Sequence, residues 1–110
     1  MVSIRQQLSI EPMREADVPT VQLIERDIFS TPWPRNAYYR ELSSRNSAHY
    51  IVLRREPADG EEPEVVGYAG MWRMYDEAHV TTIGVRHDLQ HLGYGRILFA
   101  ALVQAAYDMG

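Results

Sequence analysis

The sequence predicts one α/β domain of the α+β type, with helices packed on a mostly antiparallel sheet. Three observations support this. Two segments with apolar residues at helical spacing follow a short alternating segment. Three β-branched segments joined by short links come next, and strands linked in this way form an antiparallel meander. A turn with two glycines then leads into a third helical segment, so the expected order is β-α-α-β-β-β-α.

The N-terminal part of the chain supplies the first strand and the first helix. Residues 8–11 alternate between apolar and polar side chains and predict a short strand. Asp17 can cap the helix that follows, with Pro19 in its first turn. The two prolines within residues 30–34 end this helix. Its apolar stripe consists of Val18, Val21, Ile24 and Ile28.

A second, shorter helix is expected over residues 35–44, where Tyr38, Tyr39 and Leu42 are its apolar residues. Trp33 lies just before this helix, between two prolines. From the residues alone, this tryptophan is a plug in the hydrophobic core.

Three strands follow, and glycines mark irregular points in them. An acidic segment over 56–64, with Asp59-Gly60 as its turn, links the first two strands, and residues 75–77 link the second to the third. Gly67 and Gly70 indicate a bulge or a close approach of another group to the backbone. The expected strands are His49–Arg54, Val65–Met74 and Ala78–Val85.

The last strand leads into the turn Gln90-His91-Leu92-Gly93-Tyr94-Gly95, and a long helix is expected from Arg96. Glycines let a ligand approach the backbone, and the first N–H groups of a helix attract anions. This junction therefore predicts a phosphate or pyrophosphate site, in which the side chain of Tyr94 matters little. The core face of the helix is predicted to hold Ile97, Leu98, Ala101, Leu102 and Ala105.

Basic residues gather around this turn in a chain whose net charge is -4, so the attraction for anions is local. The two best-known phosphate loops are excluded, because the chain has neither a G-x-x-x-x-G-K-[ST] segment nor a G-x-G-x-x-G fingerprint. The basic residues are Arg86, His87, His91 and Arg96, although Arg86 and His87, with Asp88, can equally form the solvated face of the loop.

Composition limits the class of protein. A length of 110 residues fits a single domain, and the absence of cysteine excludes disulfides and thiolate metal sites. The polar start of the chain is unlike a signal peptide, and no apolar run approaches the ~20 residues that span a bilayer. The acidic balance argues against nucleic-acid binding. We therefore expect a cytoplasmic protein without membrane or nucleic-acid partners.

The segment Q-x-x-G-x-G between a strand and a helix, residues 90–95, resembles the acyl-CoA-binding motif of the GNAT N-acetyltransferase superfamily. Together with residues 76–78 and 83–85, it looks most like the branch that acetylates the N-terminal alanine of ribosomal proteins, closely followed by the archaeal and eukaryotic N-terminal acetyltransferases. The resemblance implies a mixed, mostly antiparallel sheet flanked by helices and an acetyl-CoA co-substrate, with no metal. It also implies an acceptor amine, such as a protein N-terminus.

The resemblance assigns roles to residues of this chain. Trp33 would border the acceptor-peptide site. The strand and loop would hold coenzyme A through its pantetheine arm and pyrophosphate, and Gly84 fits a site where backbone must come close to a ligand. The residues implied in coenzyme A binding are Ile83, Gly84, Val85, Gln90, His91, Leu92, Gly93, Tyr94, Gly95 and Arg96.

Catalytic residues are harder to assign. Glu77, His79, Thr81, Ile83 and Val85 share one face of the last strand if no bulge intervenes. His79 could relay a proton, as a histidine in a similar context does in related N-terminal acetyltransferases, or could simply be polar at the strand start. Glu77 could be a turn residue or contact substrate. The glutamate base and tyrosine acid of the family lie beyond Gly110, and Tyr107 is wrongly placed to substitute.

The resemblance covers nearly all of the chain, which in turn supplies roughly two thirds of the family's domain. We therefore expect residues 1–110 to form a single, incomplete domain whose last strand is a bare sheet edge. The expected function is acetyl-CoA-dependent N-acetyl transfer to a protein α-amine by direct attack on the thioester. The alternatives are transfer to lysine or a small amine, a non-catalytic acyl-CoA or partner-binding module, and a small domain whose glycine loop binds nothing. The sequence leaves the oligomeric state open.

Overall fold

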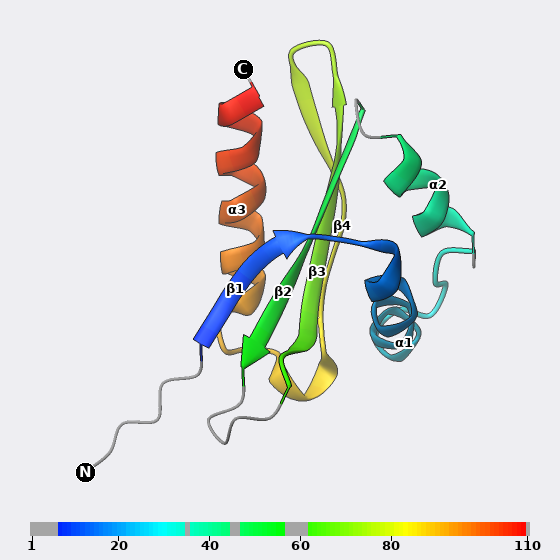
Figure 1. Ribbon diagram of the computed structural model, residues 1–110, viewed down its shortest axis with the longest axis vertical. Coiled ribbons are helices and arrows are strands. Elements are labelled where there is room, and N and C mark those ends of the chain that lie inside the picture. The colour runs from blue at the N-terminus through cyan, green and yellow to red at the C-terminus, as the bar shows by residue number, and fades with distance from the viewer. Residues whose placement is uncertain (1–6, 35, 45–46, 57–61, 110) are drawn as a thin grey trace.

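The predicted order of elements is confirmed in the computed structural model, which describes residues 7–34, 36–44, 47–56 and 62–109 (Figure 1). Short 3-10 helices, η1 (Glu15–Asp17) and η2 (His87–Leu89), precede α1 and α3. The main elements are β1 (Gln7–Pro12), α1 (Val18–Ile28), α2 (Ala37–Ser43), β2 (Ala48–Glu56), β3 (Glu64–Met74), β4 (Glu77–Val85) and α3 (Tyr94–Met109).

The four strands form one antiparallel sheet in the order β1-β2-β3-β4, so the predicted meander is confirmed. Within the described part of the chain β4 is an edge strand. Helix α3 lies on one face of the sheet, and α1 and α2 lie on the other (Figure 1). None of the described helices is long and apolar enough to cross a lipid bilayer.

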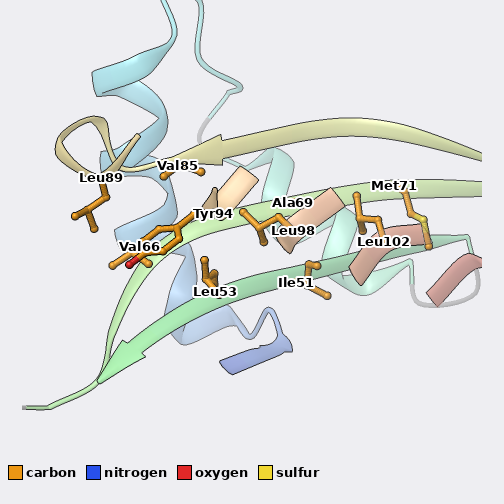
Figure 2. Packing of buried hydrophobic residues seen from close by; sticks show 10 residues of the cluster. All are labelled: Ile51, Leu53, Val66, Ala69, Met71, Val85, Leu89, Tyr94, Leu98 and Leu102. Carbon is orange, nitrogen blue, oxygen red and sulfur yellow. The ribbon is translucent and has the colours of Figure 1, made fainter. Parts of the chain in front are cut away.

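Two separate cores hold these layers together. The core under α3 is mostly aliphatic, and Leu98 and Leu102 of the helix pack there on Ile51, Leu53 and other strand residues (Figure 2). The core on the other face contains three tyrosines. Its members include Val18, Val21 and Ile24 of α1 together with Tyr38, Tyr50 and Tyr68.

Helix α3 begins at Tyr94, two residues before the predicted start. The residues of this helix that face the core also differ from those predicted. Tyr94 is only 7% exposed and packs in the aliphatic core, whereas Ile97 is 38% exposed. The prediction that Ile97 is a core residue is therefore wrong, and Tyr94, which was predicted to lie in the loop, contributes its side chain to the core.

Both glycines of β3 lie beside irregular pairing, as predicted. One register shift separates the pairs Leu53↔Gly67 and Arg54↔Val65. The second lies between Gly70↔Thr82 and Met71↔Val80, which leaves Thr81 of β4 without an opposite residue. Thr81 is therefore the extra residue of a β-bulge.

This bulge changes the facing of the first half of β4. Ile83 and Val85 pack in the core under α3. His79 pairs with Trp72, whose indole N–H donates to Glu41 of α2, so His79 lies on the opposite face. The single face that Glu77, His79, Thr81, Ile83 and Val85 would share in the absence of a bulge is therefore not formed, because alternation is interrupted at Thr81.

Other boundaries differ less. Asp17 is buried at the start of α1 but makes no capping hydrogen bond. Its carboxylate instead accepts hydrogen bonds from the backbone N–H of Arg14 at 2.9 Å and from the guanidinium of Arg54 at 2.6 Å. Helix α2 begins at Ala37, and the expected start at Arg35 lies outside the described residues, as does the Asp59-Gly60 turn.

Candidate functional site

A groove of about 380 Å³ lies where the end of β4 meets the start of α3. The C-terminal end of α1 closes one side through Ile28 and Phe29. Seven of the residues predicted to bind coenzyme A line this groove, so the end of β4 and the glycine loop contribute to the same site. They are Ile83, Gly84, Val85, Gln90, His91, Tyr94 and Gly95.

The loop between β4 and α3 is shaped by its backbone. His91 and Gly93 have positive φ angles of 70° and 87°, so the chain turns sharply before the helix. The Gln90 amide donates a hydrogen bond to the Val85 carbonyl at 3.2 Å, which ties the loop to the end of β4. The backbone N–H of Ile97 donates to the Gly93 carbonyl at 3.2 Å, and the first turn of α3 follows directly.

The two loop glycines are not required by packing inside the protein. A Cβ atom added at Gly93 or Gly95 would have no neighbour within 4 Å among the residues that the structure describes. The positive φ angle of Gly93 explains why glycine stands at that position. Gly95 is helical, so its backbone conformation does not require glycine. Glycine at position 95 lowers helix stability and leaves open space beside the helix start. Both properties fit a site where an anion approaches the first turn of α3.

Gly84 has a different explanation from the one predicted. A Cβ atom there would lie 2.5 Å from the ring of Tyr68, which packs over this position from β3. The glycine is therefore needed inside the fold, whether or not a ligand approaches the same backbone.

The positive charge near the loop is smaller than the sequence indicates. Arg86 binds Asp88 through two hydrogen bonds, of 2.7 and 3.1 Å, and also pairs with Glu64. The hydrogen bonds from Arg86 lower the pKa of Asp88. Arg86 is thus neutralised by carboxylates, and the basic residues left around the loop are exposed, namely His87, His91 and Arg96.

On the other face of the sheet, the buried carboxylate of Glu25 fixes the segment that carries Trp33. Glu25 is 2% exposed and accepts hydrogen bonds from the backbone N–H of Trp33 and the hydroxyls of Tyr38 and Tyr68. The Trp33 ring stacks on Tyr38 with 5.0 Å between ring centroids. Burial raises the pKa of both tyrosines, so their hydroxyls remain donors.

Trp33 is half-buried, so it is both a packing residue and the wall of a cavity. A pocket of about 440 Å³ lies between Trp33 and Trp72, with Glu41 on its lining. Glu41 also lines a larger groove of about 710 Å³, which extends to Met13 and His49. Its Oε1 atom accepts hydrogen bonds from the Trp72 indole and from the Tyr50 hydroxyl, the latter at 2.7 Å.

The two predicted catalytic candidates lie at the exposed start of β4. The His79 ring and the Glu77 carboxylate are 3.1 Å apart and both face solvent. The bulge at Thr81 separates them from the Ile83–Val85 stretch that lines the groove. The structure thus brings His79 and Glu77 together but not beside the glycine loop.

Sequence reasoning missed Glu41, Tyr50 and Thr81, which form one hydrogen-bonded chain across the sheet. Thr81 and Tyr50 are joined by a hydrogen bond of 2.9 Å, although they lie 31 positions apart in the sequence. The only signal in the sequence is Gly70, because a glycine in the strand between them leaves room for a ring. The register that places it there cannot be read from spacing.

Comparison with known proteins agrees with this architecture. Residues 18–110 match the profile of the Acetyltransferase (GNAT) family. A protein of Bacillus subtilis, described as a candidate [ribosomal protein bS18]-alanine N-acetyltransferase, is 31% identical over 96 residues. This alignment covers 87% of the chain and 60% of the relative, so the chain spans about three fifths of that protein.

Solved structures share the fold. The ribosomal-protein-S18-alanine N-acetyltransferase of Escherichia coli superimposes with a TM-score of 0.74 at 22% identity, over 94% of this chain and 62% of its own. The PaiA N-acetyltransferase of Thermoplasma acidophilum, in complex with coenzyme A, superimposes with a TM-score of 0.65 at 14% identity, over 94% and 74%.

Proposed function

Because this chain belongs to the GNAT family of acetyltransferases, we propose that it transfers an acetyl group from acetyl-CoA to the α-amino group of a protein N-terminus, such as that of a ribosomal protein. The acceptor class follows that of the B. subtilis and E. coli proteins, which are described as N-acetyltransferases for the alanine of a ribosomal protein. The solved complex of the T. acidophilum protein with coenzyme A supports the co-substrate.

The observation that carries the proposal is the glycine loop at the start of α3. Gly93 and Gly95 leave open space beside the helix start, and exposed Arg96 adds positive charge there. In the proposal, backbone N–H groups over residues 91–96 hold the pyrophosphate. The pantetheine arm lies along Ile83–Val85 in the adjoining groove.

The chemistry needs a neutral amine and no metal. An α-amine, with a pKa of roughly 7.7–8.0, leaves far more neutral nucleophile at pH 7 than a lysine near 10.4. The acetyl thioester supplies an activated carbonyl carbon, where a new C–N bond replaces the C–S bond. Trp33 borders the acceptor in this proposal, and His79 with Glu77 are polar contacts at the far end of β4.

Mass spectrometry of acetylated products tests the function. The chain is incubated with acetyl-CoA and a set of peptides that carry either a free N-terminus or a blocked N-terminus with a free lysine. We expect an added acetyl group on the α-amine only. Products modified solely on lysine or on small amines would overturn the α-amine assignment, and saturable acetyl-CoA binding without transfer would favour a non-catalytic binding module.

Replacing Gly95 with alanine is expected to change stability and binding in opposite directions. A Cβ atom there meets no atom of the described part of the chain within 4 Å, so the helix should gain a few tenths to about 1 kcal/mol of stability. The same methyl group narrows the proposed pyrophosphate site, and we expect the Kd for acetyl-CoA to rise about tenfold. Thermal unfolding and calorimetric titration measure the two effects, and unchanged binding in the stabilised variant would contradict the proposed site.

A further inference from the structure

The side chain of Tyr50 crosses an entire strand of the sheet. Tyr50 belongs to β2 and pairs with Gly70 of β3, yet its hydroxyl bonds to Thr81 of β4. The crossing is possible because Gly70 has no side chain. A Cβ atom at Gly70 would lie 2.1 Å from the Tyr50 ring, so the ring occupies the space where that side chain would be.

The hydrogen bonds that link Glu41, Tyr50 and Thr81 have a fixed donor-to-acceptor direction. A carboxylate only accepts, so the single hydroxyl proton of Tyr50 is donated to Glu41, at 2.7 Å. The Tyr50 oxygen must then accept from the Thr81 hydroxyl, at 2.9 Å. The Thr81 oxygen is left with lone pairs that can accept a further hydrogen bond. Burial raises the pKa of Tyr50, so its hydroxyl, the central member of this hydrogen-bonded series, stays protonated.

The two residues at the ends of this hydrogen-bonded series, Thr81 and Glu41, can both contact other molecules. Thr81 is half-buried and is the bulged residue of β4, where the strand turns a side chain out of regular alternation. It lies just before the Ile83–Val85 stretch of the coenzyme groove. At the other end, Glu41 lines both the pocket of about 440 Å³ and the groove of about 710 Å³, so a proton received there can leave through either cavity.

We propose that Thr81, Tyr50 and Glu41 form a proton relay that removes a proton from the acceptor amine, with Thr81 as the catalytic residue that touches the amine. The proposal rests on the proposed acetyl transfer. One N–H bond of the ammonium breaks and its proton passes to the Thr81 oxygen. Thr81 gives its own proton to Tyr50, and Tyr50 gives its own to Glu41. The net result is a neutral amine and a protonated Glu41, which then releases the proton to water.

The decisive variant is Glu41→Gln. The glutamine carbonyl can still accept from Tyr50 and from Trp72, so the packing of both rings is kept, but it cannot take up a proton. We expect kcat to fall about 100-fold, as for the loss of a general base, while the KM for the peptide and the Kd for acetyl-CoA stay within about threefold. The thermal unfolding midpoint should match that of the wild-type chain.

Variants at the other two positions complete the test. Thr81→Ala and Tyr50→Phe each break the relay and should lower kcat by a similar factor, whereas Thr81→Ser keeps the hydroxyl and should restore most of it. Tyr107→Phe, on the exposed side of α3, loses a hydroxyl outside the relay and is the matched control. The solvent deuterium isotope effect on kcat should be larger in the wild-type chain than in Tyr50→Phe.

The possible failures can be told apart. Wild-type turnover in Glu41→Gln and Thr81→Ala would overturn the relay and leave the acetyl transfer intact. A Thr81→Ser variant as slow as Thr81→Ala would also overturn it, because the hydroxyl would then not be the active group. If the wild-type chain acetylates none of the tested amines, the proposed function fails, and the relay fails with it for lack of a reaction.

Discussion

Gly70→Ala is expected to lower the free energy of unfolding by about 2–3 kcal/mol, near the upper end of the usual cost of overpacking. The added methyl group would lie 2.1 Å from the Tyr50 ring. The ring has little room to yield, because its hydroxyl is held by both Glu41 and Thr81 and it is 5% exposed. Thermal unfolding should show a Tm lower by at least about 10 °C.

Two controls make this prediction specific. Gly95→Ala is the same chemical change in open space and should not destabilise the chain. A double-mutant cycle with Tyr50→Ala should show strong coupling in the free energy of unfolding, because the methyl group added by Gly70→Ala has no steric clash once the Tyr50 ring is removed. If Gly70→Ala unfolds like the wild-type chain, the Tyr50 ring does not cross β3 at this position.

Gly93→Glu is expected to weaken acetyl-CoA binding at least about 100-fold. Two effects add. The φ angle of 87° disfavours any side chain other than that of glycine, at a cost of about 1–2 kcal/mol, so the loop should distort. The new carboxylate would also repel the pyrophosphate that we place at this helix start. Calorimetric titration of acetyl-CoA into the variant measures the loss.

Gly93→Asn separates the two causes, because asparagine tolerates positive φ angles and adds no charge. We expect it to bind acetyl-CoA far better than Gly93→Glu does. Equal loss in both variants would show that space, rather than charge, controls binding at this position. Binding within threefold of the wild type in Gly93→Glu would place the coenzyme elsewhere.

The order of elements was predictable because local signals agreed with each other along the whole chain. Two prolines around Trp33 separate the first two helices, and β-branched residues mark the strand before the glycine turn. The loop was predictable for the same reason, since Gly93 and Gly95 stand between a strand and a helix. In these segments the backbone conformation depends on the residues themselves.

The facing of individual side chains was not predictable in the same way. The packing of α3 on the sheet sets which of its residues face the core, and it buries Tyr94 and exposes Ile97. The bulge at Thr81 has no signature of its own, because threonine suits a regular strand equally well. It depends on the pairing of β3 with β4, which is a long-range property.

Charged and small residues of the site were visible in the sequence, but their partners were not. Arg86 is one of the basic residues around the loop, yet it is bound by Asp88 and by Glu64, which is 22 residues away. Gly84 suggested a ligand, yet the ring of Tyr68 occupies the space beside it. The net charge at Arg86 and the space beside Gly84 each depend on a residue that only folding brings close.

The bulge also determines how β4 can tolerate insertions and deletions. Side chains alternate with a period of two, so the extra residue gives the two halves of the strand opposite parity. Deleting Thr81 would restore an unbroken alternation and leave His79 opposite Trp72 and Ile83 opposite Ala69, so the other side chains of the strand would keep their faces. A relative without this residue can therefore keep the facing of every other residue of the strand and lose only the bulged side chain with its hydroxyl.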